Sequence, residues 1–305
     1  MIALPKNGYD VVGSIVIYKT DVQEVEHSIR QFLAVPLETH LCIIDNSPTP
    51  LELSQIRDPR ISYYFANANL GYGRAHNIAL RASHQRARYN LVMNTDITYA
   101  PKVVTRLVEF LNAKPKAGLA APKTLYPDGS LQHVCRLLPT PTNMFLRRFL
   151  PGTPWTRRAD SLYELRWWDH ESVANLPYFQ GSFMMLRTPL CNRLGGFDER
   201  FFLYGEDIDL TRRIHELAET LYVPEVHIRH QYRRWSNCSL LGTWHGIQNN
   251  CRYFNKWGWF FDRERQKING RVIASLRAAP HKPTQMRVNM PPHKVCEPSE
   301  GVVVI

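Results

Sequence analysis

Short apolar runs alternate with segments of helical spacing over the first 120 residues, and this alternation limits the fold more than any other feature of the chain. Buried strands are predicted at residues 11–18, 41–45, 61–65, 91–93 and 118–121, and helices at about 25–33, 73–87 and 103–111. Strands that alternate with helices in this way form a parallel, doubly wound sheet with helices on its faces. We therefore expect an α/β fold with a Rossmann-like, mostly parallel central sheet.

Polar residues follow three successive predicted strands at the point where each strand ends. The second strand ends in Asp45-Asn46-Ser47, residues 67–73 (NANLGYG) follow the third, and Asn94-Thr95-Asp96 follow the fourth. Turn propensity accounts for part of this pattern. Because ligands of such sheets bind beyond the carboxyl ends of the strands, we expect the functional site at this edge.

Three carboxylates stand together at a predicted turn-to-helix junction. Glu206, Asp207 and Asp209 fall in the first turn of a helix that is predicted to continue to Leu217. The positive end of the helix dipole keeps such carboxylates ionised, so one of them could serve as a base. Acidic residues also favour helix N-termini without any chemical role, and for an isolated acidic turn this is the more common explanation.

The alternation of strands and helices stops after Pro122. A hairpin turn is predicted at residues 126–130 and a further strand at 179–186. Residues 139–168, rich in proline, arginine and aromatic side chains, are interpreted as a mobile or membrane-facing insertion. The last residues, from about 278, carry several prolines and little periodicity and predict a poorly ordered tail.

The charge of the chain predicts an anionic partner. A net charge of +11 and a pI near 9.5 suit a nucleic acid, a phosphorylated small molecule or an acidic membrane surface. Basic and aromatic residues interleave between positions 229 and 271, which suits a lipid headgroup layer, single-stranded nucleic acid or a solvated basic helix face. Without a leader-like segment or an apolar run of about 18 residues, we expect a cytosolic protein with its six cysteines reduced.

A series of ordered blocks resembles the family 2 glycosyltransferases of GT-A fold, and among them the bacterial rhamnosyltransferases that build O-antigen and related surface polysaccharides. The resemblance runs from about residue 11 to 257. Its carrying residues are Asp45-Asn46-Ser47, 69–77 (NLGYGRAHN), Asn94-Thr95-Asp96, Asp128-Gly129-Ser130, 181–184 (GSFM), 195–199 (GGFDE) and 204–209 (YGEDID). The resemblance implies a nucleotide-sugar-binding half at 1–122, an acceptor-binding and catalytic half at 123–257, a C-terminal helical extension at 258–277 and a tail at 278–305.

By this resemblance the donor is a nucleotide sugar, with dTDP-L-rhamnose favoured and a UDP- or GDP-sugar as the alternative. Asp45 is expected to hydrogen-bond the base. Residues 69–77 are expected to close over the nucleoside and diphosphate, where glycines allow close backbone approach and helix N–H groups face phosphate. The implied donor-binding residues are Tyr18, Asp45, Asn46, Asn69, Gly71, Arg74, Asn77 and Asn94, with Arg233 and Arg234 either over the leaving diphosphate or simply solvated.

The resemblance also implies a divalent cation, Mg²⁺ or Mn²⁺, on the diphosphate. Asp96 is the expected ligand, and His230 is a second candidate with His227 as its competitor. The usual family motif has two acids around a variable residue, whereas this chain has Asn94 in the first place. One carboxylate fewer is expected to weaken metal binding.

Asp207 matches the catalytic base of the family. An acceptor hydroxyl must lose its proton as it attacks the anomeric carbon, whereas a diphosphate leaves without an acid, so one carboxylate is enough for an inverting transfer. Gly181, Ser182, Glu206 and Asp209 are expected to bind the acceptor, and Glu206 and Asp209 have the orientation of the loop as their alternative role.

The expected acceptor is a growing glycan on a polyprenyl diphosphate lipid. An enzyme with such an acceptor works at the cytoplasmic face of the inner membrane, so we expect peripheral association with an anionic membrane surface. No nucleic acid is expected as a partner.

Three other interpretations fit the sequence less well. A nucleotidyltransferase would carry a glycine-rich, arginine-containing loop after the first strand, where this chain has Lys19-Thr20-Asp21. A non-catalytic relative that tethers an assembly to the membrane would not need Asp96 and Asp207, and both are present. A nucleic-acid binder would carry a helix-turn-helix or an aromatic sheet motif, and we find neither.

Overall fold

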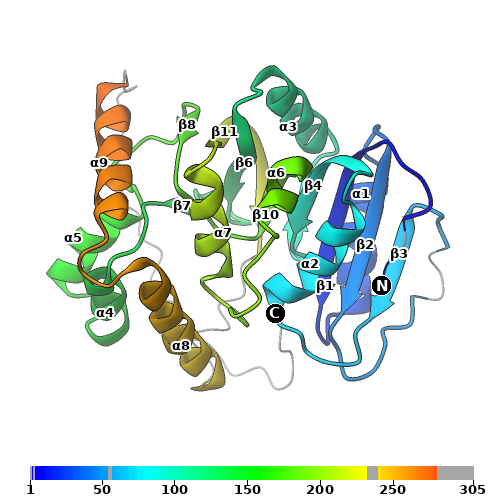
Figure 1. The fold of residues 1–305 in the computed structure, drawn as a ribbon, viewed down its shortest axis with the longest axis horizontal. Helices are drawn as coiled ribbons and strands as arrows, with labels where there is room; N and C mark the ends of the chain where they lie inside the picture. The colour runs from blue at the N-terminus through cyan, green and yellow to red at the C-terminus, as the bar shows by residue number, and fades with distance from the viewer. Residues whose placement is uncertain (1, 3, 54–56, 232–239, 280–305) are drawn as a thin grey trace.

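One mixed, mostly parallel sheet organises the chain (Figure 1). The computed structural model describes residues 2, 4–53, 57–231 and 240–279. In this part of the chain the strand order is β3-β2-β1-β4-β10-β6-β11-β5, with β8 paired to β11. The strands are β1 (Tyr9–Ile17), β2 (Thr39–Asp45), β3 (Ile61–Phe65), β4 (Ala87–Met93), β5 (Ile97–Thr98), β6 (Ala117–Leu125), β8 (Ala174–Asn175), β10 (Phe183–Arg187) and β11 (Glu219–His230).

Strand β10 is the reason that two halves of the sequence meet at one sheet edge. It lies between β4 and β6 and runs antiparallel to both, while β1, β2, β3 and β4 are parallel to one another and β11 is parallel to β6. The residues just before β10 therefore lie at the edge where β4 ends. A small second sheet of β7 (Cys135–Arg136) and β9 (Tyr178–Phe179) leads into this position.

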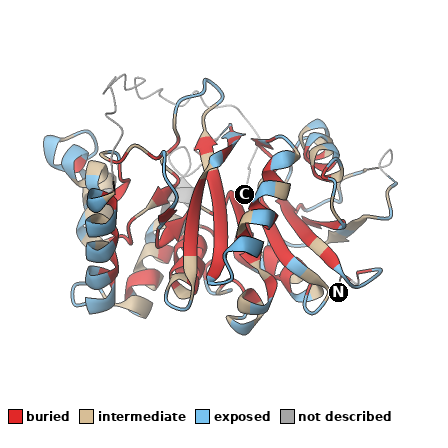
Figure 2. Cartoon of the chain, turned by 90° about the horizontal axis from the view of Figure 1, so that it is seen from above, coloured by how far each residue is buried: buried red, intermediate tan, exposed pale blue. Residues whose placement is uncertain are grey.

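Helices cover both faces of the sheet, as the alternation in the sequence predicts. On one face, α1 (Val22–Leu33) and α3 (Lys102–Ala113) bury apolar side chains against the strands, and on the other α2 (Tyr72–Ala82), α6 (Thr188–Arg193) and α7 (Glu206–His215) do so. The central strands β1, β2 and β10 are almost wholly buried (Figure 2), whereas the edge strand β3 has no buried residue. Period-2 alternation is absent from these central strands because both faces are covered, whereas residues 225–230 of β11 alternate between exposed and buried.

Within the described residues, four further helices pack beside this core. They are α4 (Pro141–Phe149), α5 (Pro154–Tyr163), α8 (Leu240–Trp257) and α9 (Arg263–Ala278). The buried residues Ile268, Val272 and Leu276 of α9 join the same apolar cluster as Leu138 and Trp168. The expected C-terminal helices are thus present, whereas the proposed boundaries at 122, 257 and 277 remain predictions.

Several predicted elements differ from the structure. The helix predicted at 73–87 ends at Ala82, because Ala87 already pairs with Tyr9 of β1. The strand predicted at 179–186 is interrupted between β9 and β10, and the helix predicted to reach Leu217 ends at His215, which leaves Leu217 exposed. The segment 139–168, expected to be a mobile or membrane-facing insertion, contains two capped helices, and its contact with a membrane remains a prediction.

Other sequence expectations concern cysteines, membrane spans and the tail. Cys42, Cys135 and Cys191 are buried free thiols and Cys251 is a half-buried one. In the described residues no helix is long and apolar enough to span a bilayer. Most of the predicted tail, residues 280–305, lies outside the described residues.

Candidate active site

Tyr72 joins the end of β4 to the segment before β10. Its hydroxyl lies 2.9 Å from Oδ1 of Asn94 and 2.6 Å from the carbonyl oxygen of Gly181. The backbone N–H of Asn94 donates to the carbonyl of Ser182 over 2.9 Å. The structure therefore brings Gly181 and Ser182 to Asn94 at the carboxyl end of β4, although they are far from Asn94 in the sequence.

The Asp207 carboxylate lies against this same segment. Oδ2 accepts a hydrogen bond from the N–H of Gly181 over 3.1 Å and a longer one from the hydroxyl of Tyr178 over 3.4 Å, and Oδ1 accepts from the N–H of Ile208. Burial raises the pKa of Asp207, and these N–H groups oppose that rise because they stabilise the ionised form. Asp207 is thus a nearly buried carboxylate held in one orientation by backbone donors.

Glu206 is the second acid at the start of α7, and its environment differs. Its Oε2 is buried and accepts no hydrogen bond within the described residues, and burial together with the adjacent Asp207 charge raises its pKa well above the ordinary glutamate value. Two neighbouring carboxylates favour a single shared proton. The N–H groups of Gly181 and Ile208 and the hydroxyl of Tyr178 stabilise the ionised form of Asp207, whereas for Glu206 only a backbone bond to its own N–H opposes the rise in pKa. The proton is therefore retained on Glu206, and Asp207 is the member that ionises first.

Asp96 and His230 form a pair at the next strand ends. Nε2 of His230 lies 3.3 Å from Oδ1 of Asp96, and Nδ1 lies 3.0 Å from Oε1 of the buried Gln132. Their backbones meet as well, because Ile97 pairs with His230 where β5 meets β11. The side chain of His227, the competing candidate, is exposed on β11. The structure thus brings His230, and not His227, to Asp96.

This pair fits a divalent cation. Oδ1 of Asp96 is buried and accepts no hydrogen bond from any described residue, and a carboxylate oxygen beside an imidazole nitrogen is a donor set that Mn²⁺ and Mg²⁺ accept. Among the described residues no cluster of three or more His, Cys, Asp and Glu side chains could hold a metal ion. A cation here would take its remaining ligands from water and from the phosphate oxygens of a donor.

The ends of β1 and β2 form a second group of predicted residues, and its contacts are mainly internal. Asp45 is fully buried: Oδ1 accepts from the N–H of Ser47, and Oδ2 accepts from the N–H of Leu51 and from the hydroxyl of Tyr63. Nδ2 of Asn46 donates to the carbonyl of Gly71 over 3.3 Å. Both oxygens of Asp45 thus have partners within the protein, and its contact with a nucleobase stays a prediction.

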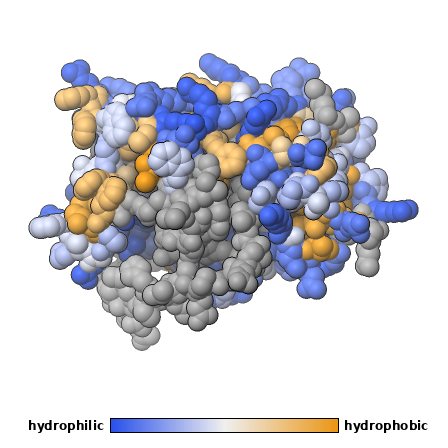
Figure 3. Space-filling model, turned by 90° about the horizontal axis from the view of Figure 1, so that it is seen from below, coloured by the Kyte–Doolittle hydropathy of each residue, from blue (hydrophilic) through white to orange (hydrophobic). Residues whose placement is uncertain are grey.

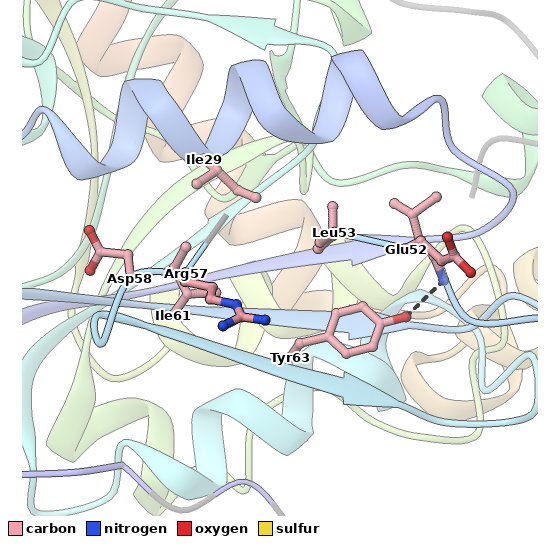
Figure 4. Close-up of a pocket in the computed structure, with 8 residues that line it drawn as sticks. Ile29, Glu52, Leu53, Arg57, Asp58, Ile61 and Tyr63 are labelled. Carbon is pink, nitrogen blue, oxygen red and sulfur yellow. Dashed lines mark hydrogen bonds between the residues drawn. The ribbon is translucent and has the colours of Figure 1, made fainter. Parts of the chain in front are cut away.

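A cavity of about 490 Å³ lies beside Tyr63, between α1 and β3 (Figure 4). Ile29, Leu53, Arg57 and Ile61 line it together with Tyr63, whose hydroxyl accepts a hydrogen bond from the N–H of Leu51. None of the predicted site residues lines this cavity, so it does not mark the site that the strand ends form.

The start of α2 is already occupied by contacts within the protein. The N–H of Gly71 donates to Oδ1 of Asn69, and the N–H of Tyr72 donates to the carbonyl of Phe202 over 3.0 Å. These two groups therefore do not offer the free N–H donors that the sequence predicts for phosphate. The side chains of Asn69 and Arg74 are exposed, and Nε of Arg74 lies 3.6 Å from Glu199.

Asn77 and Asp209, two of the residues predicted to bind a ligand, form contacts within the protein. Asn77 is buried, and its amide is paired on both sides with the backbone of Phe197 and with Glu199. Asp209 is fully buried and accepts from Arg213, Lys256 and Trp257. Each polar atom of both side chains already has a partner within the protein, so donor binding by Asn77 and acceptor binding or loop orientation by Asp209 stay predictions.

The remaining predicted residues have less defined positions. Tyr18 is half-buried directly after β1, where the next residue, Lys19, donates its N–H to Ser47. Arg233 and Arg234 lie outside the described residues.

Three site residues were missed by the sequence interpretation. Tyr72 stands inside a quoted block but received no role, whereas Arg136 and Tyr178 come from the pair β7–β9, where no periodicity signals an element. The Arg136 guanidinium lies 5.8 Å from the ring centre of Tyr178, and its charge opposes the rise in the pKa of Asp207. The topology alone brings these residues to Asp207.

Residues 14–155 match the family model described as glycosyl transferase family 2. The chain resembles this family over that stretch, which is a little under half of its length. It is 29% identical over 190 residues to the N-acetylglucosaminyl-diphospho-decaprenol L-rhamnosyltransferase of Mycobacterium tuberculosis, a match that covers 57% of this chain and 60% of that protein. It is 27% identical over 203 residues to rhamnosyltransferase WbbL of Escherichia coli K12, covering 62% and 72% of the two chains. The resemblance read from the sequence is thus confirmed.

Solved structures show the same fold at low sequence identity. The structure of GalNAc-T7 with UDP, GalNAc and Mn²⁺ superposes on this chain with a TM-score of 0.61 at 14% identity, covering 84% of this chain and 49% of that one. The mannosyltransferase PcManGT of Pyrobaculum calidifontis, in complex with GDP-Man and Mn²⁺, covers 92% of this chain and 78% of that one, with a TM-score of 0.53 and 16% identity. The predicted GT-A fold with C-terminal helices is therefore confirmed.

Proposed function

We propose that this chain transfers L-rhamnose from dTDP-L-rhamnose to a hydroxyl group of a lipid-linked glycan, with inversion at the anomeric carbon. The observation that carries the reaction type is the single oriented base, Asp207, at the strand edge where Asn94 and Gly181 meet. The choice of rhamnose rests on the two rhamnosyltransferase relatives, which are 27% and 29% identical.

Asp207 performs the proton transfer in this proposal. Its carboxylate takes the proton of the acceptor hydroxyl while that oxygen attacks the anomeric carbon and the bond to the diphosphate oxygen breaks. The diphosphate leaves with the bonding electrons and the sugar is inverted. Glu206 retains its own proton, so the pair carries one negative charge, located on Asp207.

Asp96 and His230 would hold a divalent cation, Mg²⁺ or Mn²⁺, which when bound neutralises negative charge on the leaving diphosphate. We assign Tyr18, Asn46, Asn69, Gly71 and Arg74 to the donor side because they surround the ends of β1 and β2 and the start of α2. Arg233 and Arg234 remain proposed diphosphate contacts. Gly181 and Ser182 border the acceptor side.

The acceptor is proposed to be a glycan on a polyprenyl diphosphate. The Mycobacterium tuberculosis relative carries decaprenol in its name, and that name supports a lipid-linked acceptor for this chain. Such an acceptor would place the enzyme at the cytoplasmic face of the inner membrane.

A panel of dTDP-, UDP- and GDP-sugars, with and without Mg²⁺ or Mn²⁺, tests the proposed donor. Release of nucleotide is measured for the intact protein, because slow hydrolysis reports productive donor binding even without an acceptor. We expect cation-dependent release from dTDP-L-rhamnose alone. Release from a UDP- or GDP-sugar would replace the donor assignment, and no binding of any donor would contradict the enzyme itself.

A further inference from the structure

The hairpin of α4 and α5 exposes large apolar side chains. Phe145 and Phe149 are 56% and 61% exposed and stack with ring centres 4.8 Å apart on one face of α4. Trp155 is 73% exposed, and Leu162, seven residues later on α5, is 45% exposed. Spacings of four and seven residues keep side chains on one helix face, so each helix carries an apolar stripe.

The charge around these stripes is positive. Residues 139–159 contain four arginines and no acidic residue. Arg157 and Arg158 are exposed on α5. The two acids that follow point inward, since Asp160 and Glu164 both accept from Arg147 over 3.0 and 2.8 Å.

The hairpin is built as a firm element. Thr140 and Thr153 cap the two helices through their side chains, and each helix begins with a proline. Thr156 is buried and donates to the carbonyl of Leu150, which closes the turn between the helices. The exposed aromatic side chains are therefore held in place by ordered backbone.

The base of the hairpin is connected to the catalytic carboxylate. Glu164, which follows α5, is nearly buried and lies 3.5 Å from Arg136 as well as 2.8 Å from Arg147. Arg136 contacts the ring of Tyr178, whose hydroxyl reaches Asp207. One chain of contacts thus joins the apolar hairpin to the acceptor side of the site.

We propose that the α4–α5 hairpin docks this protein onto a bilayer that contains anionic lipids. Phe145, Phe149 and Trp155 enter the interfacial layer, and Arg157 and Arg158 contact the headgroups. The docking itself follows from the surface, whereas its purpose, to bring the site to a lipid-linked acceptor, rests on the proposed function.

Charge decides for a bilayer over a protein partner. Exposed aromatic side chains among arginines, with no acids between residues 139 and 159, match the interfacial layer of an anionic membrane. Hydrophobic side chains gather among strongly hydrophilic ones at the left-hand end of Figure 3, the end where Figure 1 places α4, α5 and α9. The surface therefore offers both the exposed apolar side chains and the positive charge that peripheral membrane binding needs.

Vesicle co-sedimentation of the full chain, without donor or acceptor, tests the docking. We expect binding to vesicles of equal parts phosphatidylcholine and phosphatidylglycerol at low salt, with little binding to phosphatidylcholine alone or at high salt. The variant Phe145→Ser/Phe149→Ser/Trp155→Ser is expected to bind at least about tenfold more weakly. The variant Arg157→Glu/Arg158→Glu, which keeps the apolar stripes, is expected to bind about tenfold more weakly. Circular dichroism checks that both variants are folded.

Two matched controls locate the effect. Leu217→Ser removes an equally exposed apolar side chain after α7, at the opposite end of β11 from His230, and is expected to bind like the unchanged protein. Phe260→Ser/Phe261→Ser removes the exposed pair between α8 and α9. Loss of binding in that variant but not in the hairpin variants would overturn the proposal, as would failure of the unchanged protein to bind. If the unchanged protein is a dimer, and only the hairpin variant is a monomer while its vesicle binding stays unchanged, the occupant of this surface is a second copy of the chain instead. The vesicle assay measures no sugar transfer. Its result therefore tests the docking separately from the proposed function.

Discussion

Gly71 has a backbone conformation and a neighbour that no other residue tolerates. Its φ is +79° with ψ 172°, and a Cβ built there would lie 2.3 Å from the carbonyl oxygen of Phe202. The same carbonyl accepts the N–H of Tyr72, so it cannot move without the loss of that bond. The glycine therefore fixes how closely the start of α2 approaches the segment before α7.

Gly71→Ala is predicted to destabilise the fold by about 3 kcal/mol or more, because backbone strain of about 1–3 kcal/mol adds to a clash with backbone. Gly129 provides the matched control: its φ is +85°, but nothing lies within 4 Å of its Cβ position. Gly129→Ala should cost only about 1–2 kcal/mol. Urea unfolding of both variants measures the difference, and equal losses would contradict the close-approach argument.

The residue types of the site could be predicted, but their partners could not. Asp207 and Asp96 follow from their motif positions, and the structure places both at the expected edge. Asn77 and Asp209 carry equally polar side chains in equally recognisable blocks, yet packing uses all of their polar atoms. One-dimensional patterns do not record whether an amide or carboxylate faces a ligand or a neighbouring loop. Tyr72 illustrates the converse, because only the sheet order brings it between Asn94 and Gly181.

Helices α7 and α9 are joined by a buried ion pair. Arg212 and Asp262 have side chains 2% and 4% exposed, and their two hydrogen bonds measure 2.6 and 3.0 Å. The guanidinium also lies 3.9 Å from the ring centre of Trp257, and Asp262 caps α9. The helix that carries Asp207 is thus tied to the C-terminal helices.

Arg212→Met is predicted to lower the free energy of unfolding by about 3–5 kcal/mol, since it leaves a buried carboxylate without its main partner. Arg106→Met is the control, because Arg106 and Glu225 form a 2.7 Å pair at the surface that should contribute less than about 1 kcal/mol. Chemical denaturation compares the two variants. A loss at Arg212 no larger than at Arg106 would show that the pair does not fasten α9.

Element boundaries were harder to predict than element types. The alternation predicts the strands and helices of the first half correctly in kind, because buried strands and amphipathic helices have different periods. The break between β9 and β10 is invisible to periodicity, since FQGSFMML reads as one apolar run. Only the pairing of Tyr178 with Arg136, and of Phe183 with Met93, separates the two strands.

Two buried histidines, His76 and His170, and two half-buried ones, His133 and His215, make the fold sensitive to acid. Burial lowers the pKa of His76 and His170 to about 3, and of His133 and His215 to about 4. In the unfolded chain each has a pKa of about 6.5, so unfolding takes up protons below that pH. Their contribution to stability is complete above about pH 6.5 and is lost as the pH falls toward 4. Glu206 and Asp207 act in the opposite sense, which reduces the slope.

The free energy of unfolding, measured with urea, is therefore predicted to fall steadily as the pH is lowered from 7.5 to 4.5. The slope is about 1.4 kcal/mol per pH unit for each histidine that takes up a proton on unfolding. His170→Phe should reduce this slope, because it removes one of the protons bound on unfolding while it keeps an aromatic ring beside Trp168 and Tyr222. A free energy of unfolding that stays constant from pH 7 to pH 5 would contradict neutral, buried histidines.

The sheet order could be expected for the first four strands and not for the rest. A parallel doubly wound sheet follows from alternation, but the insertion of the antiparallel strand β10 between β4 and β6 has no local signal. That insertion creates the site, because it delivers Gly181 to the end of β4. The chain fold thus completes a site whose components lie more than a hundred residues apart.

Turnover by Asp207→Asn tests most directly whether Asp207 is the catalytic base. With the donor that the panel identifies, we expect kcat to fall about 10²–10⁴-fold, the contribution of a general base, while nucleotide affinity stays within a few-fold. Asp10→Asn, an equal change at the start of β1 on the opposite edge of the sheet, should keep full turnover. Turnover of Asp207→Asn within a few-fold of the unchanged protein would contradict Asp207 as the base.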